Sequence, residues 1–368
     1  MTGDFSASQL LQIKLKAEQM WSDAQAFAHL RPNADAAVAV INHQTARFAE
    51  LEDRNKDNTI KVTFVKTCGI GTDDCEPNCT LDEPEVETAG KDFAFDICKK
   101  TGFSIDAETL RKNTYNFAEV VAPSLATAIK KLDEFWAQQV LVKLKGFSGV
   151  NIAAQPFTYQ TPINATVVPA ALYGNPLGGY SGFQLPTMFI KQMIQNKIDN
   201  AYYIDNGRMW LEYQNSLLQR GSTDSAAVSG LQRAQQLDVN FDIFNFAQSG
   251  ITNVSTFAVG RNAIAFKTTN RHSETPVTIG GTVQQTLYTV PSIALPGVEY
   301  DVYYTVSCKT GQDGSTRYVH TWRLETKGGI WLNPEGCPVT VGAGNPNVPA
   351  GTHTPTGILA YLSDDEQI

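Results

Sequence analysis

The alternation of apolar and polar residues is clearest in the last third of the chain. From 298 to 308 every second residue is apolar and the residues between them are mostly polar, which is the period of a strand with one buried face. A polar turn at 309–315 leads into a second alternating run at 317–324. The two runs predict a long antiparallel hairpin. Cys308 falls on the apolar face, which predicts a buried thiol.

A long amphipathic helix is predicted over residues 123–145, between Pro123 and Gly146. Apolar residues recur there every three or four positions: Leu125, Ile129, Leu132, Trp136, Val140 and Leu144. The charged residues of the same segment are expected on the opposite face: Lys130, Lys131, Asp133 and Glu134.

The first 51 residues predict two further helices. Leu11 and Leu15 mark a modest apolar stripe in the first, and Ala37, Val40 and Ile41 mark the second. Neither segment carries enough apolar residues to fold alone. We therefore expect both to lie along another part of the protein.

A two-stranded arm is predicted between residues 60 and 104. Strand-like runs at 60–65 and 92–104 flank the segment 67–90, which holds three cysteines and seven acidic residues. A loop of this length in a compact domain is usually functional or extended. The acidic residues predict a solvated loop, with ionic docking onto a basic patch of a neighbouring subunit as the alternative.

The middle of the chain is expected to be irregular at 147–186 and then to form a helix–strand–helix unit over 187–220, with the strand at 201–204. Residues 257–266 predict a strand–turn–strand. The tail beyond Pro338 is rich in Gly, Pro, Asn and Thr, and is expected to be a surface strap or a frayed end.

Composition narrows the functional classes. The 368 residues are 42% hydrophobic and 18% charged, which allows a sizeable core. The net charge of −8 argues against a sequence-specific nucleic-acid binder with a basic face. Because no apolar run reaches the roughly 18–20 residues of a membrane span and residues 1–25 hold no signal-peptide core, we expect a soluble protein made in a cytoplasm.

Catalytic motifs are missing from the sequence. It contains no P-loop, nucleophile elbow or HExxH pattern, and Gly69 and Gly71 lack the third glycine of a dinucleotide-binding turn. His320 alternates with Tyr318 and Trp322, which favours a packed sheet histidine over a general base. His272 lies in a polar stretch and is expected to be solvated. The sequence therefore predicts no enzyme.

Four cysteines lie within 31 residues: Cys68, Cys75, Cys79 and Cys98. Their spacing, C-x6-C-x3-C-x18-C, lacks the CxxC pairs of common zinc sites. A structural zinc site, disulfides and unpaired thiols all stay open, and a cross-link would stiffen the arm. No other cofactor is predicted.

In its order of elements the chain resembles the major capsid proteins of tailed bacteriophages (Caudoviricetes), which share the Hong Kong-type fold with encapsulins. The resemblance implies an α+β fold with an N-arm, an extended E-loop, a P-domain with a spine helix and a long hairpin, and an A-domain. The corresponding ranges are 1–60 for the N-arm, 61–112 for the E-loop, 113–186 for the spine helix and the irregular segment, 187–275 for the A-domain, 276–338 for the P-domain strands and 339–368 for the tail.

The resemblance further implies self-assembly through hexamers and pentamers into an icosahedral shell around double-stranded DNA, bound without sequence specificity. Portal, scaffolding or decoration proteins would be the partners, with no membrane, and the virion would be the location. An encapsulin-type compartment is the alternative within this class. A β-rich surface or carbohydrate-binding protein is the alternative from another class.

Overall fold

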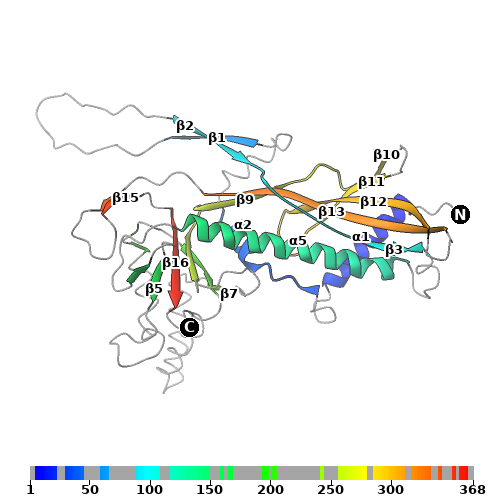
Figure 1. Cartoon of the computed structure of the whole chain (residues 1–368), viewed down its shortest axis with the longest axis horizontal. Coiled ribbons are helices and arrows are strands. Elements are labelled where there is room, and N and C mark those ends of the chain that lie inside the picture. The colour runs from blue at the N-terminus through cyan, green and yellow to red at the C-terminus, as the bar shows by residue number, and fades with distance from the viewer. Residues whose placement is uncertain are drawn as a thin grey trace, which may run out of the picture. The chain divides into compact units, whose positions relative to one another are not determined.

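The structure is a computed structural model of the 368-residue chain (Figure 1). It describes residues 5–22, 30–44, 59–65, 88–107, 117–148, 158–160, 165–168, 193–194, 196, 198, 201–205, 241–243, 256–279, 285–310, 316–332, 339–341, 350–353 and 356–363. These residues form helices and strands in separate stretches of the chain, as the predicted α+β class requires.

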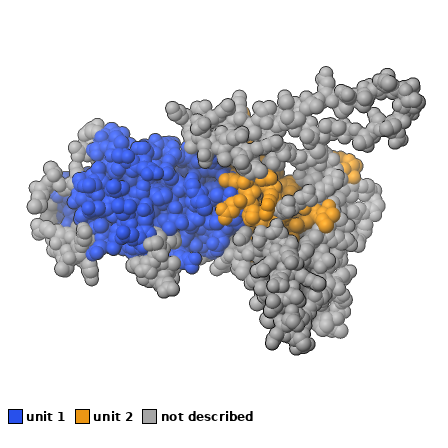
Figure 2. Space-filling view, turned by 180° about the vertical axis from the view of Figure 1, so that it is seen from behind, with its two compact units in different colours: residues 1–41, 95–139, 266–329 blue, residues 42–94, 140–265, 330–368 orange. Residues whose placement is uncertain are grey.

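The chain divides into two compact units, coloured separately in Figure 2. Unit 1 comprises residues 1–41, 95–139 and 266–329, and unit 2 comprises residues 42–94, 140–265 and 330–368. Each unit is therefore assembled from three separate segments of the sequence.

The sheet of unit 1 is built around the predicted hairpin. Strand β12 (Glu299–Thr310) pairs with β13 (Thr316–Leu332) in an antiparallel register that sets Tyr304 opposite Trp322. On one side the sheet continues through β11 (Gln285–Pro291) and β10 (Val277–Ile279). Strand β3 (Ile97–Asp106) pairs with the other edge of β13. Strand β9 (Ile264–Thr269) also pairs with β13, off that path. The hairpin prediction is confirmed.

Helix α5 (Phe117–Phe147) is the long predicted helix, and its 31 residues span roughly 46 Å. It runs along β12 and β13 (Figure 1). The six residues predicted to face the core are at most 3% exposed. The predicted start at Pro123 is wrong, since the helix begins two turns earlier. Pro123 lies in the second turn, where its missing N–H costs one backbone hydrogen bond, and its carbonyl accepts the Thr127 hydroxyl at 2.8 Å.

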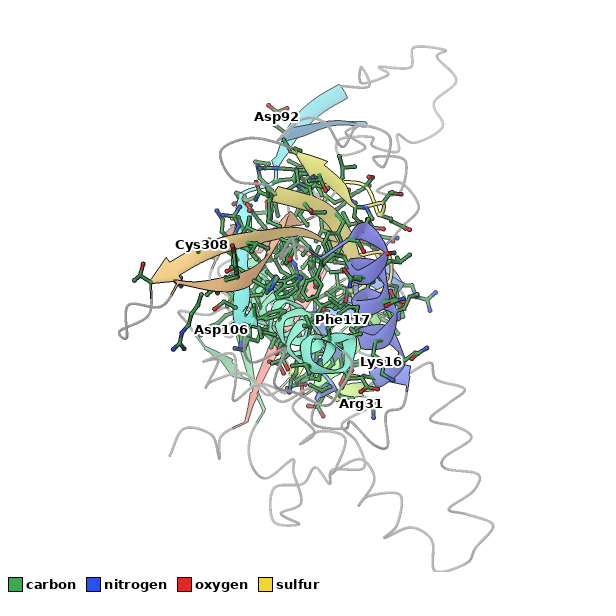
Figure 3. All side chains as sticks on the ribbon, turned by 90° about the vertical axis from the view of Figure 1, so that its right-hand side faces the viewer. Lys16, Arg31, Asp92, Asp106, Phe117 and Cys308 are labelled. Atoms are coloured by element: carbon green, nitrogen blue, oxygen red, sulfur yellow. The ribbon has the colours of Figure 1, made fainter. Side chains whose placement is uncertain are left out.

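Helix α1 (Ala7–Ser22) lies beside α5, as the view along α5 from Phe117 shows (Figure 3). Ser6 and Gln9 form a capping box: the Ser6 N–H bonds Gln9 Oε1 at 2.9 Å and the Gln9 N–H bonds Ser6 Oγ at 3.4 Å. The buried face contains Leu10, Ile13, Ala17 and Met20. The predicted stripe is wrong, because Leu11 and Leu15 are 44% and 49% exposed.

The start of α1 is anchored by Phe5. Its ring lies 4.7 Å from that of His320 and 5.1 Å from that of Phe117, and its backbone N–H donates to the Tyr304 hydroxyl at 3.1 Å. Helix α2 (Asp35–His43) buries mainly alanines and Val40. Both N-terminal helices therefore pack against other elements, as the sequence predicts.

Unit 2 contains a mixed six-stranded sheet in the order β4-β5-β16-β8-β6-β7. The bounds are Thr158–Gln160 for β4, Ala165–Val168 for β5, Ile358–Ser363 for β16, Thr256–Gly260 for β8, Ala201–Asp205 for β6 and Phe241–Ile243 for β7. The predicted strand at 201–204 is confirmed as β6. The predicted strand–turn–strand is confirmed as β8 and β9, although these strands join different sheets.

The expectation of a surface strap or frayed end after Pro338 is wrong for its last strand. Strand β16 lies inside the sheet between β5 and β8, and its residues 358–360 are at most 3% exposed. A separate small pair, β14 (Val339–Val341) and β15 (Gly351–His353), precedes it. The prediction failed because the Gly- and Pro-rich composition of the tail is typical of a loop and not of a buried strand.

Strands β1 (Thr59–Val65) and β2 (Thr88–Ala94) form an antiparallel two-stranded ribbon, from Thr59 opposite Ala94 to Val65 opposite Thr88. The predicted arm is confirmed in these strands. The single strand predicted over 92–104 is wrong, since β2 ends at Ala94 and β3 pairs with β13. The predicted helix over 206–220 and most of 187–200 lie outside the described residues.

Candidate functional site

Of the four cysteines in the predicted site, one lies among the residues that the structure describes. Cys98 is an exposed free thiol on β3, and Cys68, Cys75 and Cys79 lie outside the described residues. Within the part of the chain that the structure describes, no group of three or more His, Cys, Asp and Glu side chains is placed to hold a metal. The predicted burial of Cys308 is wrong: the strand face turns outward toward the hairpin end, and the thiol is exposed.

The two histidines singled out in the sequence differ in environment. His320 is 4% exposed, and its Nδ1 lies 2.7 Å from the Tyr304 hydroxyl, so it is packed in the sheet as predicted. His272 is half-buried rather than solvated, with its ring edge-on to Tyr303 at 5.1 Å. Its backbone N–H donates to Asp301 at 3.1 Å.

Asp301 on β12 connects that stretch to the sheet. Its carboxylate accepts the Arg271 and His272 backbone N–H groups, and it is 5% exposed. Desolvation raises the pKa of Asp301, and these hydrogen bonds and the neighbouring positive charges oppose the increase. The arrangement fixes residues 271–272 against the sheet.

A strongly perturbed carboxyl group is found at Asp133, which the sequence analysis placed on the exposed face of α5. That expectation is wrong, because the side chain is 0% exposed. Its Oδ1 accepts the Ser292 hydroxyl at 2.6 Å and the Tyr300 hydroxyl. Burial raises the pKa of Asp133 to about 7, and the two hydroxyl groups limit the increase.

The spacing of residues could have identified Asp133. It lies four residues after Ile129 and three before Trp136, both of which are on the buried stripe of α5. Because the side chain is charged, the sequence analysis placed it on the exposed face, although the helical period places this position in the core. The burial of Tyr300, in contrast, follows directly from the alternation of β12.

A small open pocket of about 260 Å³ lies between β3 and the first turns of α5. Its lining residues are Thr101, Gly102, Phe103, Pro123, Ser124, Thr127, Ala128 and Lys131. Lys131 is the single titratable side chain in this lining, so the pocket contains no paired acid and base. Over the residues described here, no helix is both long and apolar enough to cross a membrane.

Comparison with known protein families and with curated proteins finds no match. Solved structures of similar shape do exist. A chain of Mycobacterium phage Che8 is 13% identical over 85% of this chain and 87% of that chain, with a TM-score of 0.46. The capsid of Cyanophage P-SCSP1u is 9% identical over 84% of this chain and 84% of that chain, with a TM-score of 0.42. The capsid of Myoviridae phage XM1 is 12% identical over 83% of this chain and 87% of that chain, with a TM-score of 0.39. Because all three TM-scores lie below 0.5, we base the functional proposal on the chain's own elements.

Proposed function

We propose that this chain is the major capsid protein of a tailed bacteriophage. The observation that carries the proposal is the combination of a 31-residue helix lying along a long hairpin with a two-stranded ribbon that belongs to neither six-stranded sheet. These are the elements of the Hong Kong-type fold that the sequence resembles. The proposed role is structural and non-enzymatic.

The elements support an assignment to the parts of that fold. In the proposal, α5 is the spine helix, β12 and β13 are the long P-domain hairpin, and β1 and β2 are the E-loop. Residues 187–275 are the A-domain, and residues 1–60 are the N-arm. The mixed sheet around β6 and β8 supports the A-domain, because both strands come from that range.

The ribbon supports assembly on physical grounds. An isolated two-stranded ribbon is marginal in water. Its base is held by Trp331, whose Nε1–H donates to the Ala94 carbonyl at 3.1 Å and whose ring meets Phe93 edge-on at 5.4 Å. We propose that the remainder is stabilised by neighbouring copies, in hexamers and pentamers that close into an icosahedral shell.

The proposed cargo is double-stranded DNA, enclosed without sequence specificity. The net charge of −8 supports loose enclosure, since a strongly basic wall would bind the phosphates tightly. Portal, scaffolding or decoration proteins are the proposed partners, and the proposed location is the virion after synthesis in the host cytoplasm. A structural zinc ion or disulfides at Cys68, Cys75, Cys79 and Cys98 stay a prediction.

The test is negative-stain microscopy and sedimentation of the purified full chain, with and without a candidate scaffolding protein. Closed shells, or rings of five and six, are expected. A 40 kDa monomer that persists with that partner present would overturn the proposal. The ratio of nucleic acid to protein in particles from infected cells then separates a DNA-filled capsid from a compartment with protein cargo.

A further inference from the structure

The joint between α5 and the connection from β11 to β12 contains a fully buried carboxyl group. Asp133, in the middle of α5, is 0% exposed. One oxygen, Oδ1, accepts both the Ser292 hydroxyl and the Tyr300 hydroxyl. The other oxygen, Oδ2, is buried without a hydrogen-bond partner among the residues described. An ionised carboxylate in this position would keep half of its acceptor capacity unsatisfied.

The connection holds the Ser292 hydroxyl in a fixed orientation. The Ser292 N–H donates to the Val298 carbonyl at 2.7 Å, and the Leu295 N–H donates to Ser292 Oγ at 2.9 Å. Gly297 completes the turn at a φ of +70°, a conformation that favours glycine. Since Ser292 Oγ accepts from Leu295, its own hydrogen is directed to Asp133. The hydrogen-bonding partners therefore belong to two elements, α5 and the connection.

The charges around Asp133 do not compensate for its burial. On α5, Glu134 is the next residue and disfavours the ionised form, while its own carboxylate pairs with Lys130 at 3.7 Å. On β12 the facing titratable group is Tyr300, which is a neutral donor. From the connection, Ser292 and the Ala294 N–H contribute dipoles but no charge. None of the described residues contributes a positive charge that offsets the burial of Asp133.

We propose that Asp133 is a proton-controlled latch between α5 and the β11–β12 connection. Neutral Asp133 keeps the joint closed. When the proton leaves to solvent, the buried charge requires water, and water reaches it only if the connection separates from the helix. This inference concerns the stability of unit 1 and does not depend on the proposed capsid function.

The direction of the pH effect follows from the two states of the group. In the closed joint the pKa is about 7, and in an open, hydrated joint it returns toward 3.8. Protonation therefore favours the closed state, and closure weakens as the pH rises from the lower value through the higher one. The opening equilibrium constant should increase roughly a hundredfold between pH 5 and pH 8.

The experiment is hydrogen exchange of the full chain by mass spectrometry between pH 5 and pH 8, with intrinsic exchange rates removed. Peptides covering residues 125–140 and 290–302 should open progressively with a midpoint near pH 7. The Asp133→Asn variant keeps the shape of the side chain without its charge, so its corrected exchange should be independent of pH. The same pH dependence in Asp133→Asn would overturn the proposal.

Three further measurements keep the test sharp even if Asp133→Asn folds poorly. The infrared band of a protonated buried carboxyl group should be present at pH 5 and disappear with the same midpoint. Ser292→Ala, which removes a donor to the ionised form, should move the midpoint upward, and Glu134→Gln, which removes a repelling charge, should move it downward. A carboxyl group already ionised at pH 5, or shifts in the opposite directions, would contradict the latch.

Discussion

Gly328 on β13 lies at a position where no other residue fits. A Cβ atom there would lie 2.6 Å from the Lys267 carbonyl oxygen and 2.8 Å from Cη2 of Trp136. The ring of Trp136 cannot retreat, because its Nε1–H donates to Thr326 Oγ1 at 3.0 Å and Phe266 packs edge-on against it at 5.0 Å. The close contact with the backbone of β9 therefore has to be relieved by moving that strand.

We expect Gly328→Ala to lower the free energy of unfolding by about 2–3 kcal/mol, the usual cost of overpacking a rigid site. Gly146 in the last turn of α5 is the matched control, because a Cβ there meets nothing within 4 Å. Gly146→Ala should raise stability by about 0.5–1 kcal/mol through helix propensity. Urea unfolding followed by circular dichroism measures both, and equal effects of the two variants would refute the steric argument.

At the same scale, the spacing of apolar residues in α5 predicts which of them are buried, but it does not show which polar groups they are buried with. The core residues of α5 follow from their spacing alone. The helical period places Asp133 among them, but its hydrogen-bond partners could not be assigned, because Ser292 and Tyr300 are 159 and 167 residues away along the chain. His272 is similar: its contact with Tyr303 depends on a loop folding back over the sheet.

At the scale of elements, local patterns predict those elements whose partners are close in sequence. Only five residues of the sequence separate β12 from β13, so alternation is sufficient to identify the hairpin. Strand β16 pairs with β5 and β8, which are separated from it by roughly 100–190 residues, and its flanking Gly and Pro residues indicate a loop. Helix α1 lies between these two cases: the sequence predicts that the helix exists but not which of its faces is buried.

The buried face of α1 can be tested by comparing the stability of variants at two neighbouring leucines, Leu10 and Leu11. The side chain of Leu10 is fully buried within unit 1, with 0% of its surface exposed, whereas that of Leu11 is 44% exposed. Leu10→Ala should cost about 2–4 kcal/mol through the lost burial and the cavity it leaves. Leu11→Ala should change stability by less than about 0.5 kcal/mol. Thermal unfolding of the two variants distinguishes them, and a larger loss for Leu11→Ala would indicate that α1 packs through its other face.

At the scale of the whole molecule, the ribbon of β1 and β2 forms a two-stranded sheet of its own, separate from both six-stranded sheets. The described strands pair with each other, and Trp331 holds their base through Ala94 and Phe93. The proposed function assigns their remaining stabilisation to neighbouring subunits. Shortening the arm should therefore affect assembly far more than folding.

The register offers a way to shorten the arm without disturbing the ribbon. Val65 lies opposite Thr88 in the antiparallel pair, so residues 66–87 can be replaced by Asn-Gly, which forms the two-residue turn that suits such a hairpin. We expect this variant to keep its helix content and its unfolding midpoint, because helix α5 and the strands of both six-stranded sheets come from other parts of the chain. Sedimentation should show that it no longer forms shells.

A second variant separates the length of the arm from its charge. Exchanging the seven acidic residues between 73 and 87 for Asn and Gln keeps the length and removes the charge. If ionic docking holds the arm, this variant and high salt should weaken assembly to a similar degree, because both remove the same attraction. Shells that form equally well from the shortened chain would show that the arm does not join subunits, and would leave the closed surface to be explained by the two compact units alone.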